Sequence, residues 1–573
     1  MTLDEASRLR ILTAPGGAFP LIKRTIDGVD LEMFDRDPRT MRDAFLATAA
    51  HAERTAVVYG EERWTFQDQW NTVVALAYAL RDELGIRKGD RVGLAMRNYP
   101  EFIFTFWAGQ LLGAVVIPFN GWLKTEELAE LIAESRPTLL VADRERITYL
   151  AEEDLAASGV RSIVAVRAEN APTPRVDLID FDELLGRVGQ VSEPPAVDLD
   201  PEDPSTILYT SGTTSKPKGA LHSHRNHSAS MLNKMIRAMR IVPDSPTGPH
   251  EILPPAPSTK LVTFPFFHIA GMNTLYTAGY SGHTLVLMYK WDADEAVRLV
   301  AAEKVNEVAG PPFVVQTFLE VAAASDADLS SLRIIGMGGS KPPAKVVATI
   351  EARFEGRVAL RTGYGLTETT SGVVSISAAD AARHPDSVGR PLPTAQIAIL
   401  GEDDQPVAQG QEGEIAVRGP QVVSGYFNRP DADDFRNGWF HTGDLGRIDE
   451  EGLVYIVGRL KDVVIRGGEN INCAEVEGAI TAHPDVLEAA ALGAPHETLG
   501  EEVVAVARLV PGSEVTAEEL RSFVAERLAA FKVPVRIALS DIALPRTPSG
   551  KVVKREVVPA LSLADLIKPP TRV

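Results

Sequence analysis

Residues 209–219 read Tyr209-Thr210-Ser211-Gly212-Thr213-Thr214-Ser215-Lys216-Pro217-Lys218-Gly219. The segment combines hydroxyl groups, two lysines and two glycines, and no Asp or Glu occurs between Ser205 and Arg240. Hydroxyl donors, ammonium groups and the backbone N–H groups that glycine leaves accessible together suit a polyphosphate. Solvated linkers share this composition, but the density of donors without acceptors favours a phosphate-binding loop. The spacing differs from the Walker pattern, which disfavours a P-loop kinase or GTPase.

This loop resembles the signature loop of the adenylate-forming superfamily, which includes acyl-CoA synthetases, non-ribosomal adenylation domains and luciferases. The chain has Ser215 where the family has glycine, and serine adopts positive φ less readily than glycine. The resemblance implies that Thr213 takes part in catalysis and in the metal site. It also implies a set of nucleotide contacts in this loop: Thr210, Ser211, Gly212, Thr213, Thr214 and Lys218.

Length and composition limit the function classes. With 573 residues, two or more domains are expected. The net charge of −20 argues against a nucleic-acid partner and against an anionic membrane surface. The single cysteine, Cys473, excludes an intramolecular disulfide and fits a cytoplasmic protein. The N-terminus has charged residues before any apolar run, so no signal peptide is expected.

Strand and helix patterns alternate along most of the chain, which predicts an α/β fold with largely parallel sheets. We expect a large N-terminal domain, residues 1–458, of mixed sheets with helices plus a β-rich subdomain from about residue 396. A small mobile α+β C-terminal domain follows at 459–573, with a hinge near 459–462. Proline and glycine interrupt the two long apolar stretches, so no transmembrane segment is expected. Residues 226–241 are predicted to be a helix, and the proline-rich residues 242–257 an insertion or mobile loop.

A second motif, Thr362-Gly363-Tyr364-Gly365-Leu366-Thr367-Glu368-Thr369, contains a carboxylate suited to Mg²⁺ on phosphate oxygens. It matches the superfamily's second signature residue by residue. By that resemblance Tyr364, flanked by Gly363 and Gly365, stacks near adenine, and Thr367 contacts the α-phosphate. Glu368 is then a metal ligand and a catalytic residue. Gly338-Gly339-Ser340 resembles the loop that lies along the adenine.

Further positions match the family in the second half of the chain. Asp444 resembles the aspartate that accepts hydrogen bonds from both ribose hydroxyls, and a carboxylate is a natural acceptor for a diol. Ile456 and Arg459 are expected near the same nucleotide. By resemblance, Lys551 is the catalytic lysine that bridges the attacking carboxylate and the α-phosphate, where charge develops in the transition state.

The resemblance also implies a rotation of the C-terminal domain between two half-reactions. Lys461 then occupies the hinge, and Gly467, Gly468 and Glu469 form the loop on the coenzyme A side. His268 matches a gate near the carboxylate and is by that resemblance a catalytic residue, although a core histidine is the more usual explanation of such a residue. The expected acyl pocket includes His268, Met272, Met337, Gly338 and Thr369, and its largely apolar lining suggests a hydrophobic acyl group.

These matches identify the chain as a suspected AMP-forming acyl-CoA ligase of the adenylate-forming superfamily. The expected reaction uses ATP, Mg²⁺ and coenzyme A to convert a carboxylic acid into its thioester. Fatty, aromatic and polycyclic acids all remain open. A stand-alone enzyme that loads a carrier protein and a non-catalytic nucleotide-binding relative are the alternatives, and a homodimer is the prior expectation.

Overall fold

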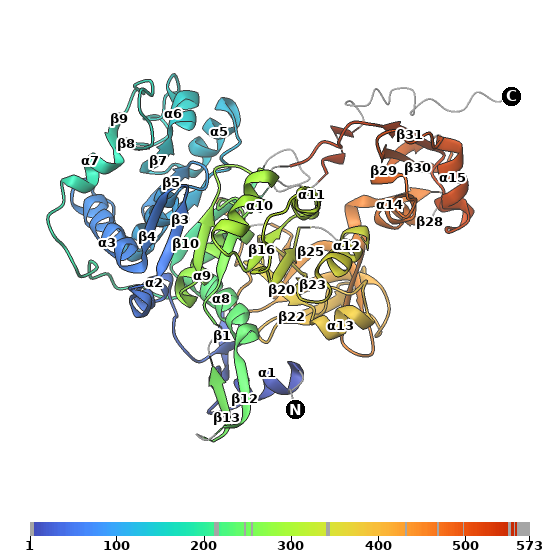
Figure 1. The fold of residues 1–573 in the computed structure, drawn as a ribbon, viewed down its shortest axis with the longest axis horizontal. Coiled ribbons are helices and arrows are strands. Elements are labelled where there is room, and N and C mark those ends of the chain that lie inside the picture. The colour runs from blue at the N-terminus through green and yellow to red at the C-terminus, as the bar shows by residue number, and fades with distance from the viewer. Residues whose placement is uncertain are drawn as a thin grey trace. The chain divides into compact units, whose positions relative to one another are not determined.

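The computed structural model describes residues 5–210, 217–245, 248–253, 256–339, 344–429, 432–466, 469–496, 498–547, 552–554 and 556–557. The chain divides into two compact units. The larger unit comprises residues 1–383, 391–396 and 418–440, and the smaller unit comprises 384–390, 397–417 and 441–573. The predicted domain boundary at 458/459 stays a prediction. The predicted α/β class is confirmed (Figure 1).

One seven-stranded sheet of the larger unit has the order β11-β10-β6-β5-β7-β8-β9. Its strands are β5 (Arg91–Ala95), β6 (Val115–Pro118), β7 (Leu139–Asp143), β8 (Ser162–Val166), β9 (Asp177–Asp180), β10 (Pro204–Thr210) and β11 (Lys218–Ser223). Neighbouring strands are parallel except β10 and β11, which are antiparallel. The phosphate-loop candidate therefore connects the two strands at one edge of this sheet.

The second seven-stranded sheet has the order β18-β17-β16-β14-β15-β3-β4. Its strands are β3 (Thr55–Tyr59), β4 (Glu62–Thr65), β14 (Thr259–Val262), β15 (Thr284–Leu287), β16 (Glu307–Gly310), β17 (Ile334–Met337) and β18 (Ala359–Arg361). All pairs are parallel except β3 with β4. The alternation of strands and helices in the sequence predicted this arrangement, because parallel neighbours need crossover connections.

Helices lie on both faces of the two sheets. The central layer contains α2 (Met41–Leu46), the short 3₁₀ segment η1 (Ala47–His51), α3 (Phe66–Asp82), α4 (Pro100–Leu112), α7 (Phe181–Gly186), α8 (His224–Ala238) and α9 (Ile269–Ser281). The outer layers contain α5 (Thr125–Ser135) and α6 (Arg144–Leu150) on one side, and α10 (Ala293–Ala302), α11 (Pro312–Ala323) and α12 (Ala344–Phe354) on the other. Helix α3 begins where expected, because Thr65 and Asp68 form a reciprocal capping box.

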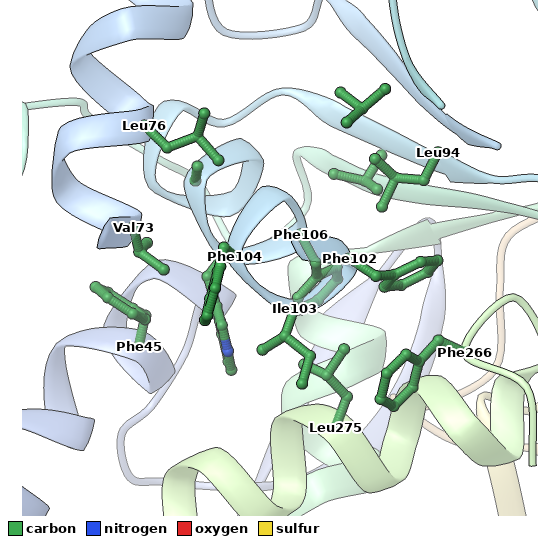
Figure 2. Packing of buried hydrophobic residues seen from close by; sticks show 14 of the residues in the cluster. Phe45, Val73, Leu76, Leu94, Phe102, Ile103, Phe104, Phe106, Phe266 and Leu275 are labelled. Atoms are coloured by element: carbon green, nitrogen blue, oxygen red, sulfur yellow. The ribbon is translucent and has the colours of Figure 1, made fainter. Parts of the chain in front are cut away.

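The largest hydrophobic cluster fills the central layer around α4. Figure 2 shows Phe102 beside Phe266, with Phe104 and Phe106 on other sides of the same helix. Nearly every α4 side chain is buried, which explains why this stretch has the hydrophobicity of a membrane span. Among the described residues, no helix is both long and apolar enough to cross a membrane.

The segment after α8 differs from its prediction. Helix α8 ends at Ala238, and residues expected to be a helix end and a mobile loop instead form a hairpin of β12 (Arg240–Ser245) and β13 (Gly248–Leu253). Figure 1 shows this hairpin beside α1 (Glu5–Thr13) and the hairpin of β1 (Leu21–Ile26) and β2 (Val29–Phe34). Ile252 packs against a small buried cluster that includes Leu12 and Ile236. The hairpin thus extends the body of the larger unit.

The remaining elements of the larger unit are short. They are β19 (Gly363–Leu366), β20 (Ser371–Ser375), α13 (Ala378–Arg383), β21 (Arg390–Pro391, across the unit boundary) and β24 (Phe435–Arg436). Strands β19 and β20 form an antiparallel hairpin directly around the second motif.

The smaller unit contains two groups of strands. The first group is β22 (Gln396–Leu400), β23 (Gly413–Arg418), β25 (Trp439–Ile448) and β26 (Val454–Arg459), three of which begin or end near the unit boundary. The second is a five-stranded sheet of β27 (Val463–Arg466), β28 (Glu469–Asn472), β29 (Val486–His496), β30 (Gly500–Leu509) and β31 (Arg536–Ser540). Helices α14 (Cys473–Thr481) and α15 (Ala517–Ala525) cover it, with the 3₁₀ segments η2 (Leu460–Asp462) and η3 (Ala530–Lys532). This matches the expected β-rich part and α+β tail.

Candidate active site

Several predicted residues lie outside the described part of the chain. They are Ser211, Gly212, Thr213, Thr214, Ser340, Gly467, Gly468 and Lys551. Their assigned roles stay predictions.

The base of the phosphate-loop candidate is closed by its flanking strands. Thr210 donates from Oγ1 to the carbonyl of Lys218 at 3.3 Å. On the other side of β11, the N–H of Phe427 donates to the carbonyl of Gly219 at 2.8 Å. These contacts fix the two ends of the loop against the segment that precedes β24.

Lys218 is already paired in this arrangement. Its Nζ lies 2.6 Å from Oδ2 of Asp434 and 4.7 Å from the centre of the Tyr426 ring. A cation held over an aromatic face and against a carboxylate keeps its charge at low cost. The resemblance predicted Lys218 as a nucleotide contact but gave no indication of Tyr426 or Asp434. An Asp and a Tyr in a polar segment have no distinguishing sequence signal.

Glu368 is the most buried carboxylate near this pair. The residue is 8% exposed, and its Oε1 accepts a hydrogen bond from the Tyr426 hydroxyl at 2.8 Å. Burial raises the pKa of the Glu368 carboxyl, while the hydrogen bond from Tyr426 and the more distant Lys218 act in the opposite direction. No ion pair reaches Glu368 within the part of the chain that the structure describes. A buried carboxylate in this state fits a divalent cation, because Mg²⁺ is usually held by one or two carboxylates together with substrate phosphates.

The glycines of the second motif have a structural cause. A Cβ on Gly365 would lie 2.0 Å from the carbonyl oxygen of Ser371, and one on Gly363 would lie 2.5 Å from that of Val374. Both glycines therefore let β19 approach β20, and this places Tyr364 between them with its side chain buried. The sequence interpretation had related these glycines to the ligand alone.

Two neighbours hold the turn that contains Thr367 and Glu368. His222 Nε2 lies 2.9 Å from the Thr367 carbonyl, and burial lowers the pKa of His222 to about 4, so the ring is neutral at pH 7. Thr369 is fully buried and accepts at Oγ1 from the N–H of Leu366 at 2.8 Å. Thr369, predicted to line the acyl pocket, thus also closes the turn before Glu368.

His268 begins helix α9. Its Nδ1 accepts from the N–H of Ala270 at 3.2 Å, and its ring stacks on Phe264 with centroids 5.8 Å apart. Burial lowers the pKa of His268 to about 4. Because Nδ1 is an acceptor, the neutral ring carries its proton on Nε2, which can donate a hydrogen bond. Gly338 also lies near Phe264, because a Cβ there would be 3.9 Å from Cζ of that ring.

A cleft adjoins Phe264 and extends between β14, β16 and α9. Its empty space, including the part open to solvent, is about 280 Å³. Its lining comprises residues 260–264, Gly271, Thr274, Glu307 and Ala309. Met272 and Met337, predicted for the pocket, are buried in the two hydrophobic clusters on either side of the second sheet.

The cleft contains charge as well as apolar surface. Among the described residues that line it, none is one of the five predicted for the acyl pocket, and Lys260 and Glu307 form an ion pair there with Nζ and Oε2 2.5 Å apart. The two residues are 47 positions apart in the sequence. A charged residue inside each of two apolar strands was the signal that could have identified them.

The smaller unit contains the ribose-site candidate. Asp444 and Arg459 lie opposite each other on β25 and β26, and Arg459 Nε is 2.7 Å from Oδ1 of Asp444. Asp444 is only 4% exposed, so it is a carboxylate held in place by a guanidinium. Ile456 lies on the same β26, opposite Gly446.

The hinge and the coenzyme A side are described in part. Lys461 lies in η2, directly after β26, and Glu469 is exposed at the start of β28. Cys473 is buried, and burial raises the pKa of its thiol to about 12. It is therefore protonated and unreactive at neutral pH, in agreement with the assignment of the reacting thiol to coenzyme A.

Two family models match most of the chain. The AMP-binding enzyme family matches residues 45–427, and the AMP-binding enzyme C-terminal domain matches residues 475–551. The chain is 34% identical to a feruloyl-CoA synthase from Amycolatopsis over 88% of this chain and 95% of the relative. It is 32% identical to the long-chain-fatty-acid–CoA ligase FadD13 from Mycobacterium tuberculosis, over 82% and 88% of the two chains.

A solved structure of similar fold is o-succinylbenzoate CoA synthetase from Bacillus subtilis in complex with its acyl-adenylate intermediate. Its TM-score is 0.74 at 28% identity, covering 90% of this chain and 97% of that one. The chain therefore belongs to the AMP-binding enzyme family, and it is an acid–thiol ligase of the AMP-forming type.

Proposed function

We propose that this protein joins a hydrophobic carboxylic acid to coenzyme A in two half-reactions. In the first, a carboxylate oxygen forms a bond to the α-phosphorus of ATP, and the bond from that phosphorus to the bridging oxygen breaks to release pyrophosphate. In the second, the thiol sulfur bonds to the acyl carbon, the acyl–oxygen bond breaks to release AMP, and the thiol proton passes to solvent. The adenylate makes a poor leaving oxygen into a good one.

The observation that carries this proposal is the buried carboxylate of Glu368, which no ion pair reaches among the described residues and on which Lys218 of the phosphate-loop candidate acts electrostatically. When Mg²⁺ is bound there, it neutralises charge on the phosphate oxygens. Glu368 would hold the ion, and the Tyr426 hydroxyl would orient the carboxylate. The pairing of Lys218 with Asp434 leaves Glu368 available for this role.

The other site residues take the roles that their chemistry allows. Asp444 would accept hydrogen bonds from the ribose hydroxyls with Arg459 as its counter-ion. The Nε2–H of His268 would donate a hydrogen bond to the carboxylate of the acid, and Gly338 and Phe264 would form one wall of the acyl pocket. Lys551 would stabilise the charge that develops at phosphorus, and rotation at Lys461 would then withdraw it.

We assign a hydrophobic body to the acid. Phe264, Val262 and Ala309 supply apolar surface in the cleft, and relatives of this chain are named for ferulic, long-chain fatty and indoleacetic acids. We place the enzyme in the cytoplasm, since its one cysteine is a buried free thiol. A symmetric dimer is the assembly we expect.

The test measures exchange of labelled pyrophosphate into ATP with a panel of hydrophobic acids, then AMP release on addition of coenzyme A or a carrier protein. Exchange with a hydrophobic acid and release with coenzyme A are expected. Exchange followed by release only with a carrier protein would favour the alternative enzyme, and no exchange with any acid would favour a nucleotide-binding relative.

The variant Lys551→Ala separates the two half-reactions. It should reduce exchange by about a hundredfold or more, because a lysine that stabilises transition-state charge is removed, and leave the conversion of supplied acyl-adenylate to thioester largely intact. Lys532→Ala, which removes a lysine paired with Glu475 on the surface of the same unit, is the control and should change neither step. Equal loss of both steps in Lys551→Ala would contradict the two-conformation mechanism.

A further inference from the structure

The cleft beside Phe264 has two chemically different ends. Beyond the carboxyl end of β14 it is bounded by Phe264, whose ring stacks on His268 and lies near Gly338. At the amino end of β14 it is bounded by Lys260. Lys260 and Phe264 are four positions apart, and Phe264 lies two residues beyond the end of β14, so the two residues are at most about 13 Å apart along the chain. An acid whose carboxylate lies near His268 therefore directs its far end toward Lys260.

Lys260 and Glu307 are aligned by strand register. They are direct partners on the parallel strands β14 and β16, so both side chains leave the sheet on the same face. That face also presents Val262 and Ala309, and it is covered by α9 through Gly271 and Thr274. The ion pair is consequently part of the cleft wall. It lies two residues from Val262 and Ala309, toward the amino ends of both strands.

Burial makes this pair unusual. The side chains are 18% and 19% exposed, and replacing such a pair by apolar residues of similar volume is often neutral or stabilising. Burial alone would raise the pKa of Glu307, but attraction to Lys260 outweighs it and keeps the pKa below the ordinary value. Glu307 is therefore ionised at neutral pH, and packing alone does not account for an ion pair inside a cleft that is otherwise lined by uncharged residues.

The pair has unused hydrogen-bonding capacity. Lys260 donates one of its three N–H groups to Oε2 of Glu307. Within the described residues, Oε1 of Glu307 accepts no hydrogen bond, and Lys260 donates no other. A free donor and a free acceptor thus lie side by side at the deep end of the cleft.

Nearby groups add positive charge. Lys234 of α8 interacts electrostatically with both members of the pair; burial and then Lys260 lower its pKa to about 8, so it is mostly charged at pH 7. His283 is neutral, because burial lowers its pKa to about 3, and it accepts at Nδ1 from the N–H of Ser258. The ammonium groups of Lys260 and Lys234 thus favour a ligand oxygen that accepts a hydrogen bond, and the Glu307 carboxylate favours one that also donates a proton.

We propose that the acid carries a hydroxyl group at the end remote from its carboxylate, and that Lys260 and Glu307 bind this hydroxyl. The inference deepens the function proposed above and depends on it. The hydroxyl oxygen accepts from Lys260 and its proton is donated to Oε1 of Glu307. A second carboxylate in this position is attracted by Lys260 and Lys234, but it is repelled by Glu307 and has no proton to donate to it, whereas a hydrocarbon end leaves both charges without the water it displaces.

The test compares acids of one carbon skeleton, matched in length to the cleft, that end in a methyl or ring C–H, a hydroxyl or a carboxylate. The readout is kcat/KM for pyrophosphate exchange with each acid. For the wild type, the hydroxyl acid should exceed both others by about tenfold to a hundredfold, the range expected for hydrogen bonds to charged groups.

The informative variant is Lys260→Met with Glu307→Leu, which removes both charges and so avoids an unpaired buried charge. It should lose the preference for the hydroxyl acid and favour the unsubstituted acid, chiefly through KM. The control is Arg298→Met with Glu295→Leu, which removes an exposed ion pair on α10 and should keep the wild-type preference.

Each outcome has a definite meaning. Wild-type preference for the unsubstituted acid or the dicarboxylate overturns the hydroxyl assignment and leaves the proposed function intact. An unchanged preference in the double variant overturns the role of the ion pair. Absence of exchange with every acid in the wild type defeats the proposed function itself, and the hydroxyl assignment with it.

Discussion

Two buried glutamates of the larger unit, Glu368 and Glu307, have pKa values displaced in opposite directions. Glu307 lies 2.5 Å from the ammonium of Lys260, which keeps its pKa below the ordinary value despite burial. Glu368 has the neutral hydroxyl of Tyr426 as its hydrogen-bond donor, and burial raises its pKa. The two pKa values differ because Lys260 pairs with Glu307 itself, whereas the lysine near Glu368 pairs with Asp434.

Among the described residues, Lys218 is the cation that acts on Glu368, and Asp434 holds it at 2.6 Å. Near Glu307 the cation faces the glutamate itself. A carboxylate with a permanent counter-ion needs no cation from the substrate, whereas one whose potential partner is occupied elsewhere keeps a site for a cation that arrives with the substrate. We therefore expect Glu368 to bind the Mg²⁺ of Mg·ATP and Glu307 to bind the uncharged end of the acid.

The largest effect that tests this contrast is on activity. Glu368→Gln preserves shape and can still accept from Tyr426, but it removes the charge that would hold Mg²⁺. Pyrophosphate exchange should fall by about a hundredfold or more, with partial recovery at high Mg²⁺. A matched isosteric control, Glu303→Gln in the ion pair with Arg63, lies outside the candidate site and should retain activity. Full exchange activity in Glu368→Gln at low Mg²⁺ would remove Glu368 from the metal site.

A smaller effect, on stability, compares the two lysines. Lys260→Met leaves Glu307 buried without a counter-ion and should lower the free energy of unfolding by about 3 kcal/mol. Lys218→Met leaves Asp434, whose side chain is 35% exposed and stays hydrated, so the loss should be about 1 kcal/mol or less. Urea unfolding followed by circular dichroism measures both. Equal losses would mean that the two pairs do not differ in burial as the structure indicates.

The sequence predicted the parts of the fold that depend on local pattern. The capping box of Thr65 and Asp68 and the alternation that yields two parallel sheets were both readable, because each is set by neighbouring residues. The β12–β13 hairpin was missed because Pro243 and its neighbours indicate a loop. In a two-stranded ribbon every strand is an edge, where proline is tolerated.

In the candidate site, too, residues of contiguous motifs could be identified from the sequence, and residues brought together by strand pairing could not. Glu368 was identified because its motif is contiguous, and its resemblance to a known family supplied a role. Lys260 and Glu307 were not, since only the parallel register of β14 and β16 brings them together. Tyr426 was missed for a similar reason: the isolated bridge between Ala220 and Tyr426 carries its ring to Lys218 and Glu368. Motifs locate individual residues, whereas pairing across strands determines what those residues contact.

The smallest effect is the pH dependence of stability, and it has opposite signs for the two glutamates. The folded-state pKa of Glu368 is raised, so its contribution is present below about pH 4.3, the ordinary glutamate pKa, and is lost as the pH rises through the folded value. Glu368→Gln avoids this loss, and its stability relative to the wild type should increase from pH 4 toward pH 7.

The pKa of Glu307 is lowered, so its contribution is present above about pH 4.3 and is lost as the pH falls through the folded value. The double variant Lys260→Met with Glu307→Leu should therefore gain relative to the wild type as the medium is acidified. Urea midpoints of the three proteins from pH 3 to pH 8 measure both slopes, and slopes of the same sign would show that the two carboxylates lie in equivalent environments.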